Sequence, residues 1–151
     1  MIQYESASKV SASAIRKMLA DIGSMDRVWW RGALGLDADP EAQQPAVVGG
    51  KTALFHAHGI PDPDDLFMAF ADAVFILERL RDWARRFSVK WHLRMNDEEW
   101  GSVDPTGYSK DLRGELEKWS RRAGAAPSGK DRWTISLERR AELLRRHSGR
   151  H

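Results

Sequence analysis

The stretch that follows Pro61-Asp62-Pro63 constrains the fold most, because it carries the longest helical pattern in the chain. Asp62 or Asp64 can cap the start of this helix, and the pattern continues to about Phe87. Its first half is apolar on nearly every side, whereas its second half places arginines on one outer face. We therefore expect a helix that is buried on more than one side and forms the spine of the core.

Shorter patterns on either side predict the remaining elements. Helical spacing follows serine caps and ends at glycines, and alternation of apolar and polar residues predicts strands between turn-forming residues. Three further helices are predicted after Ser11 or Ser13, after Ser109 and after Ser136. The predicted strands are Val28 to Leu36, a hairpin with its turn at Gly49-Gly50, Val89 to Met95 with Trp100 to Val103 as partner, and Trp133 to Ile135, whereas residues 125–130 are predicted to form a loop.

These elements predict an α+β fold. One single-layer antiparallel sheet of hairpins is expected to pack against the long central helix and two or three shorter helices. The chain has 151 residues, of which 42% are hydrophobic, and this is enough for one domain with a real core. We expect that domain to cover residues 1–147, with residues 148–151 as a frayed tail.

The absence of cysteine limits both the chemistry and the compartment. Zero cysteines exclude disulfides, thiolate metal sites and cysteine nucleophiles, and they fit a reducing compartment. The first residues do not resemble a secretory leader, and no apolar stretch approaches the length of a membrane span. We expect a cytoplasmic protein that does not contact a membrane.

Charge is distributed unevenly along the chain. Residues 1–108 contain 12 Lys or Arg against 16 Asp or Glu, whereas residues 109–151 contain 12 against 6. The basic C-terminal third could therefore bind a nucleic acid, with neighbouring tryptophans stacking on bases. Since Trp91 and Trp119 fall on apolar faces, they are more simply explained as core residues, and nucleic-acid binding stays the alternative function.

A histidine pair offers a second alternative, a small metalloenzyme. His56 and His58 would point to the same face of a strand and could share one metal ion. The spacing from Gly50 through this pair to Asp62 loosely resembles the first metal motif of the cupin barrels. The pattern departs from that family at Asp62, where a Glu is usual, in lacking a following Gly, and in placing a long helix where a barrel needs strands.

Other possible catalytic motifs have local explanations. Gly49-Gly50-Lys51-Thr52 resembles the end of a phosphate-binding P-loop, but Pro45 stands where the first Gly belongs and a strand pattern follows. The acidic groups at 62–65 and 97–99 lie at a helix start and in a turn, where carboxylates are common. We therefore predict no catalytic residues and no cofactor.

Protein binding is the function that the remaining features favour. Two candidate surfaces stand out, because Trp and Arg are frequent in interfaces and charged strand faces are available to partners. The expected partner is another protein, a toxin or an enzyme, and this chain would be a small bacterial inhibitor or adaptor similar to the immunity proteins. The candidate partner-binding residues are Trp29, Arg31, Asp37, Asp39 and Glu41 on one surface, and Lys90, His92 and Arg94 on the other.

Overall fold

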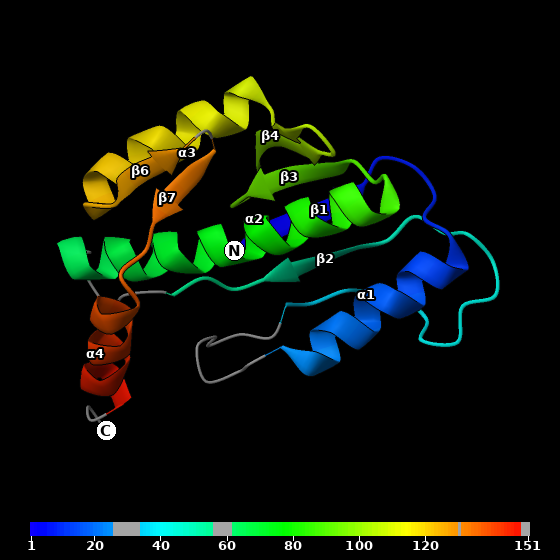
Figure 1. Ribbon diagram of the computed structural model, residues 1–151, viewed down its shortest axis with the longest axis horizontal. Helices are drawn as coiled ribbons and strands as arrows, with labels where there is room; N and C mark the ends of the chain where they lie inside the picture. The colour runs from blue at the N-terminus through cyan, green and yellow to red at the C-terminus, as the bar shows by residue number, and fades with distance from the viewer. Residues whose placement is uncertain (26–33, 56–61, 130, 149–151) are drawn as a thin grey trace.

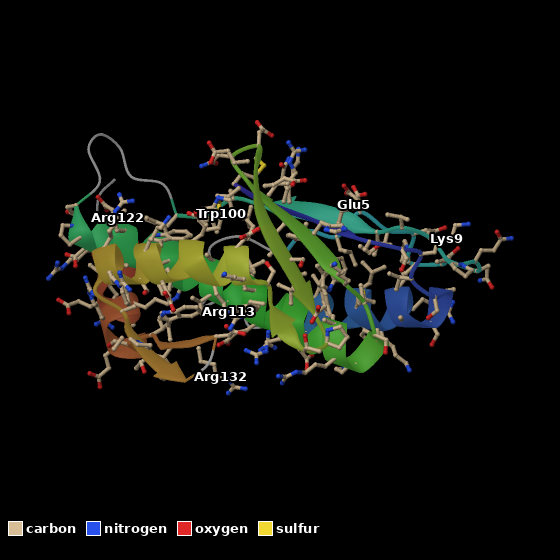
Figure 2. The ribbon with its side chains drawn as sticks, turned by 90° about the horizontal axis from the view of Figure 1, so that it is seen from above. Glu5, Lys9, Trp100, Arg113, Arg122 and Arg132 are labelled. Carbon is tan, nitrogen blue, oxygen red and sulfur yellow. The ribbon has the colours of Figure 1, made fainter. Side chains whose placement is uncertain are left out.

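The computed structural model describes residues 1–25, 34–55, 62–129 and 131–148, and it has the predicted α+β fold. A five-stranded antiparallel sheet forms one layer, and three helices lie side by side against one of its faces (Figures 1 and 2). The sheet order is β2-β1-β3-β4-β5, with β1 Ile2–Ser6, β2 Gly49–Thr52, β3 Trp91–Met95, β4 Glu98–Asp104 and β5 Gly107–Tyr108. The helices of this layer are α1 Ala12–Ser24, α2 Pro63–Phe87 and α3 Lys110–Ala123.

Helix α2 is the predicted spine of the core. Asp62 accepts the Asp65 N–H at 2.8 Å and Asp65 accepts the Asp62 N–H at 3.1 Å, so the first turn is capped reciprocally. One side of α2 packs on the sheet, and the opposite side of its first half meets the C-terminal helix α4, Leu137–Ser148. Phe67 and Leu143 belong to this second, smaller apolar cluster. The prediction that α2 is buried on more than one side is confirmed.

The shorter helices also begin where their serines predict. The Ser11 and Ser109 hydroxyls accept backbone N–H groups of the first turns of α1 and α3, at 3.1 and 3.4 Å. The Ser136 hydroxyl does the same at 3.1 Å before α4. Gly124 ends α3 with a φ of 72°, a left-handed conformation that glycine adopts without strain.

One interior strand of the sheet, β1, was not predicted. β1 lies between β2 and β3, pairing Ile2 with both Thr52 and Met95. Ile2, Tyr4 and Ser6 face the helices and are buried, while the alternate residues face outward. The alternation is present in the sequence but spans only five residues, and its buried set includes a serine.

Two local predictions were wrong. Gly49-Gly50 does not form a turn, because both residues lie within β2. A Cβ on Gly50 would collide with the backbone oxygen of Gly35, so the glycine serves close backbone approach. The loop predicted for residues 125–130 contains a strand in its described part, since β6 Ala126–Gly129 pairs with β7 Arg132–Thr134.

The strand predicted from Val28 lies largely outside the described residues. Its described end, residues 34–36, forms no strand and runs beside β2, where the Asp37 N–H donates to the Gly49 oxygen at 2.7 Å. None of the helices within the described ranges combines the length and apolar character needed to cross a membrane.

Candidate functional site: the open face of the sheet

The five-stranded sheet has one face toward the helices and one face that no described element covers (Figure 2). Strand alternation decides which side chains reach the uncovered side, because successive residues point to opposite faces. Glu5, Lys51, His92, Arg94 and Glu99 are all exposed there. We call this surface, together with the half-buried Gln3, the open sheet face.

Strand register arranges these side chains in two rows. The register aligns Lys51, Gln3, Arg94 and Glu99 across four strands in one row, and Gly49, Glu5, His92 and Ser102 in the next. Residues aligned in this way on one face lie within reach of each other. The open sheet face therefore presents charges of both signs in a fixed pattern.

An irregularity in β4 keeps Glu99 in this pattern. The register between β3 and β4 shifts between Leu93 and Arg94, which is the mark of a β-bulge. At this bulge Gly101 adopts a φ of 127° and lies against α3, where a Cβ would meet the Ser109 hydroxyl. Trp100 turns to the same side and packs edge-on against Trp119, with ring centroids 5.8 Å apart.

The charges of the open sheet face are not paired with one another. Among the described residues, Glu5, Lys51, His92 and Glu99 form no ion pair and no side-chain hydrogen bond. Arg94 donates only to the backbone oxygen of Asp97, at 2.9 Å. These groups therefore keep their capacity to bind a partner.

A shallow hollow of about 690 Å³ lies over the same strands. Asp37 stands at its rim, and so does Val47, whose exposed fraction of 50% is high for an apolar residue. The strand edges beside the hollow offer little to a partner, because residues 34–37 run along β2 and β5 has only two residues. The face of the sheet, and not its edge, is the available surface.

On the buried side of the sheet, beneath the hollow, a tyrosine joins neighbouring segments. The Tyr4 hydroxyl donates to the Gly35 backbone oxygen and lies 3.1 Å from the Thr52 hydroxyl. Burial raises the Tyr4 pKa to about 12, although the hydrogen bond with Thr52 opposes the change. This contact ties β1 to β2 and to the segment that borders it.

The predicted site residues are only partly brought together. Asp37, His92 and Arg94 line one hollow, although they came from two separate predicted surfaces. Asp39 and Glu41 lie in an exposed turn outside it, where Asp39 accepts the Glu41 N–H at 2.9 Å. Trp29, Arg31, His56 and His58 lie outside the described residues.

Lys90 precedes β3 and stands near Asp104. Hydrogen bonds from Thr106 hold the Asp104 pKa below its ordinary value, and the charge of Lys90 adds a smaller effect. Sequence reasoning missed Gln3, Glu5, Lys51 and Glu99, which complete the open sheet face. The alternation in residues 2–6 was the one signal that could have found the first two.

Four of the acidic residues considered for catalysis have structural roles. Asp62 and Asp65 cap α2, and Asp64 accepts Arg139 at 2.8 Å. Asp97 forms the β3–β4 turn with a φ of 68°, a conformation typical of tight hairpins. In the described part of the chain, no group of three or more His, Asp or Glu side chains is placed to hold a metal ion.

The basic C-terminal third is partly neutralised within the protein. Several of its cations form ion pairs, and these are Arg113 with Asp131, Lys118 with Glu115, Arg139 with Asp64, Arg140 with Asp72, and Arg146 with Glu142 and Asp64. In Figure 2, Arg122 lies apart from Arg113 and Arg132. The ion pairs leave fewer of the cations of this third available to a nucleic-acid backbone.

Comparison with known proteins gives no relative for this chain, since no protein-family model, no curated protein and no solved structure matches it.

Proposed function

We propose that this protein is a non-enzymatic binding domain of the inhibitor or adaptor type, which docks another protein on its open sheet face. The observation that carries the proposal is the set of unpaired charges arranged in rows on that uncovered face. Several charged side chains of α2 and α4 form ion pairs within the protein, whereas the described charged residues of the open sheet face form none.

The mixed signs of these charges favour a protein as the partner. A nucleic acid would be repelled by Glu5, Glu99 and Asp37, and it would find no exposed Phe, Tyr or Trp side chain among the described residues of the face. A protein surface can match charges of both signs, and the exposed Val47 supplies an apolar contact at the rim. The partner we propose is a toxin or an enzyme with a polar, mixed-charge surface, met in a bacterial cytoplasm, as for an immunity protein.

The test uses charge reversal on the two layers of the protein. The wild-type protein, the double variant Lys51→Glu/Arg94→Glu, and the control Lys17→Glu/Arg85→Glu serve as baits in host lysate, with and without nuclease treatment. Lys17 and Arg85 are exposed on the helix layer, so the control changes the net charge equally. We expect one dominant protein to bind the wild type and the control but not the double variant at the open face.

The captured protein is then purified and titrated with the three baits to measure Kd. A loss of at least tenfold for the Lys51/Arg94 variant alone supports the proposal, and inhibition of the partner's activity identifies an inhibitor. Equal binding by all three baits, or capture that disappears with nuclease, contradicts it. The second result would restore the basic C-terminal third as the functional surface.

A further inference from the structure

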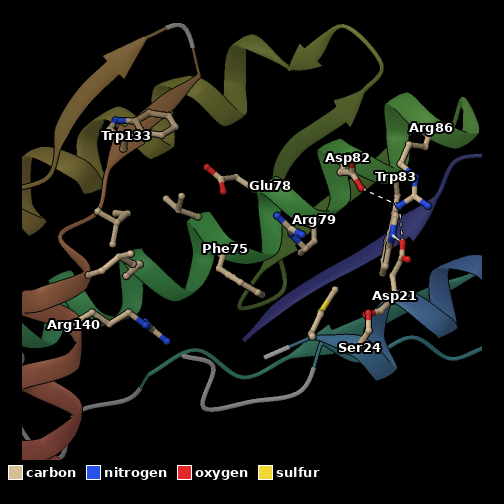
Figure 3. A pocket seen from close by; sticks show the side chains of 15 residues that line it. Asp21, Ser24, Phe75, Glu78, Arg79, Asp82, Trp83, Arg86, Trp133 and Arg140 are labelled. Carbon is tan, nitrogen blue, oxygen red and sulfur yellow. Dashed lines mark hydrogen bonds and ion pairs between the residues drawn. The ribbon is translucent and has the colours of Figure 1, made fainter. Parts of the chain in front are cut away.

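A second cavity, of about 610 Å³, lies on the opposite side of the molecule (Figure 3). It follows the face of α2 that points away from the sheet, between the end of α1 and the segment from β7 to α4. Its size falls within the range of small-molecule sites. Leu137 stands at its rim with an exposed fraction of 60%, so this apolar side chain has no cover in the described structure.

The charges at the two ends of this cavity are already paired. At one end Arg86 contacts Asp21 at 2.7 Å and Asp82 at 3.1 Å. At the other end Arg140 contacts the buried Asp72 at 2.8 Å. The guanidinium groups at the two ends of the cavity are therefore already occupied by carboxylates of the protein and are not available to a ligand.

Arg79, near the middle of the cavity, differs from these arginines. Its guanidinium lies over the Phe75 ring, 5.5 Å from the centroid, and forms no ion pair with any described residue. Its Nε is buried and has no hydrogen-bond partner. A half-buried cation that lacks a counter-charge is a candidate anion-binding site, because a guanidinium can bind a carboxylate through two parallel hydrogen bonds.

The walls around Arg79 are largely apolar. Val74 and Phe75 line the cavity from α2, and Trp133 and Ile135 line it from the C-terminal segment. Figure 3 shows Phe75 and Trp133 on these two elements. Aromatic and branched side chains of this kind bury an apolar group of a ligand. Glu78 also lines the cavity but is exposed.

We propose that this cavity binds a small apolar carboxylate, with the carboxylate on Arg79 and the apolar part between Phe75 and Trp133. The proposal is independent of protein binding by the open sheet face, because it uses none of the same residues.

The test needs no knowledge of the natural ligand. The probes are 3-phenylpropanoate and its matched alcohol and amine, which share the phenylpropyl group and differ in charge. Isothermal titration calorimetry gives the affinity, and proton–nitrogen NMR reports whether the Trp133 indole N–H signal shifts. We expect the carboxylate to bind at one site at least tenfold more tightly than the alcohol or the amine.

Variants then locate the site. Arg79→Gln should weaken 3-phenylpropanoate binding at least tenfold, Arg79→Lys should weaken it less, and the control Arg85→Gln should leave it unchanged. Arg85 is an exposed arginine of the same helix, without an ion pair among the described residues. The proposal is overturned if the wild-type protein does not bind the carboxylate, if the amine or the alcohol binds as tightly, or if Arg79→Gln and Arg85→Gln bind equally.

Discussion

Gly35 and Gly50 show how one missing side chain can decide local structure. The two residues bring the segment 34–37 against β2 so closely that a Cβ on Gly50 would overlap the Gly35 oxygen, and a Cβ on Gly35 would lie 2.8 Å from the Lys51 oxygen. Backbone atoms on both sides cannot rotate away as a flexible side chain could. The close path of residues 34–37 along β2 therefore depends on these glycines.

Replacing Gly50 by alanine should destabilise the protein by about 1 to 3 kcal/mol, the usual cost of forcing extra volume into a packed site. The matched control is Gly114→Ala in α3, where a Cβ meets no atom within 4 Å. That change should stabilise the protein by about 0.5 to 1 kcal/mol, because alanine favours a helix interior. Urea unfolding measures both, and a Gly50→Ala protein as stable as the wild type would contradict the close approach.

The two tyrosines of the chain predict a loss of stability at alkaline pH. Burial raises the pKa of Tyr4 and of Tyr108 to about 12, above the ordinary value of 10.0. A pKa that is raised in the folded state contributes stability in full below pH 10 and loses it as the pH rises through 12. The expected loss is about 2 to 3 kcal/mol for each tyrosine, at about 1.4 kcal/mol per pH unit.

Absorbance of the phenolate measures this effect directly. The folded protein should show little tyrosinate at pH 11, whereas protein unfolded in urea should titrate near pH 10. Tyr4→Phe should remove about half of the alkaline loss of stability. Titration of both tyrosines near pH 10 in the folded protein would contradict their burial.

At the scale of elements, α4 is attached to the rest of the protein by a buried ion pair. Arg140 contacts Asp72 at 2.8 Å, and both residues are less than 5% exposed. Asp72 also accepts the Phe55 backbone N–H at 2.8 Å, so one carboxylate joins α2, α4 and the segment after β2. The attachment of α4 thus combines a small apolar cluster with this polar contact.

Arg140→Met should cost about 3 to 5 kcal/mol, because it removes the guanidinium that lies 2.8 Å from the buried Asp72 carboxylate. Arg145→Met, at an exposed position of the same helix, should change the stability by less than about 0.5 kcal/mol. Urea unfolding gives both values, and hydrogen exchange should show that α4 amides lose protection first. If the two variants lost similar amounts of unfolding free energy, the result would contradict the role of the ion pair.

The elements also show what the sequence could and could not predict. Helices α1, α2 and α3 were predicted because each combines helical spacing with a side-chain cap within a few residues. β1 and the pairing of β6 with β7 were missed, because short strands gain their stability from distant partners that local patterns do not contain. Gly49-Gly50 was misread for the same reason, since its neighbour is Gly35.

Prediction of the site was also limited by contacts between segments that are distant in the sequence. Alternation was enough to place His92 and Arg94 on a polar strand face, and that placement is what the structure has. Lys51 and Glu99 could not be added without the strand order and the bulge at Gly101. Asp37 was assigned to another surface, because its approach to Gly49 is a contact between distant segments.

At the scale of the molecule, part of the uneven charge along the chain is neutralised by ion pairs between its acidic and basic segments. The acidic start of α2 lies beside the basic α4, where Asp64 contacts both Arg139 and Arg146. The open sheet face and the Arg79 cavity lie on opposite sides of the two layers, so a ligand on one side leaves the other side accessible.

The position of β1 inside the sheet, between β2 and β3, also affects how the chain can fold while it is being synthesised. Ile2 pairs with Met95, so the first strand made waits for more than ninety further residues before its β3 neighbour leaves the ribosome. Until then the apolar side chains of β1 and the free edge of that strand are without their final cover. A chaperone that holds nascent chains would therefore act on this protein most in the interval before β3 emerges.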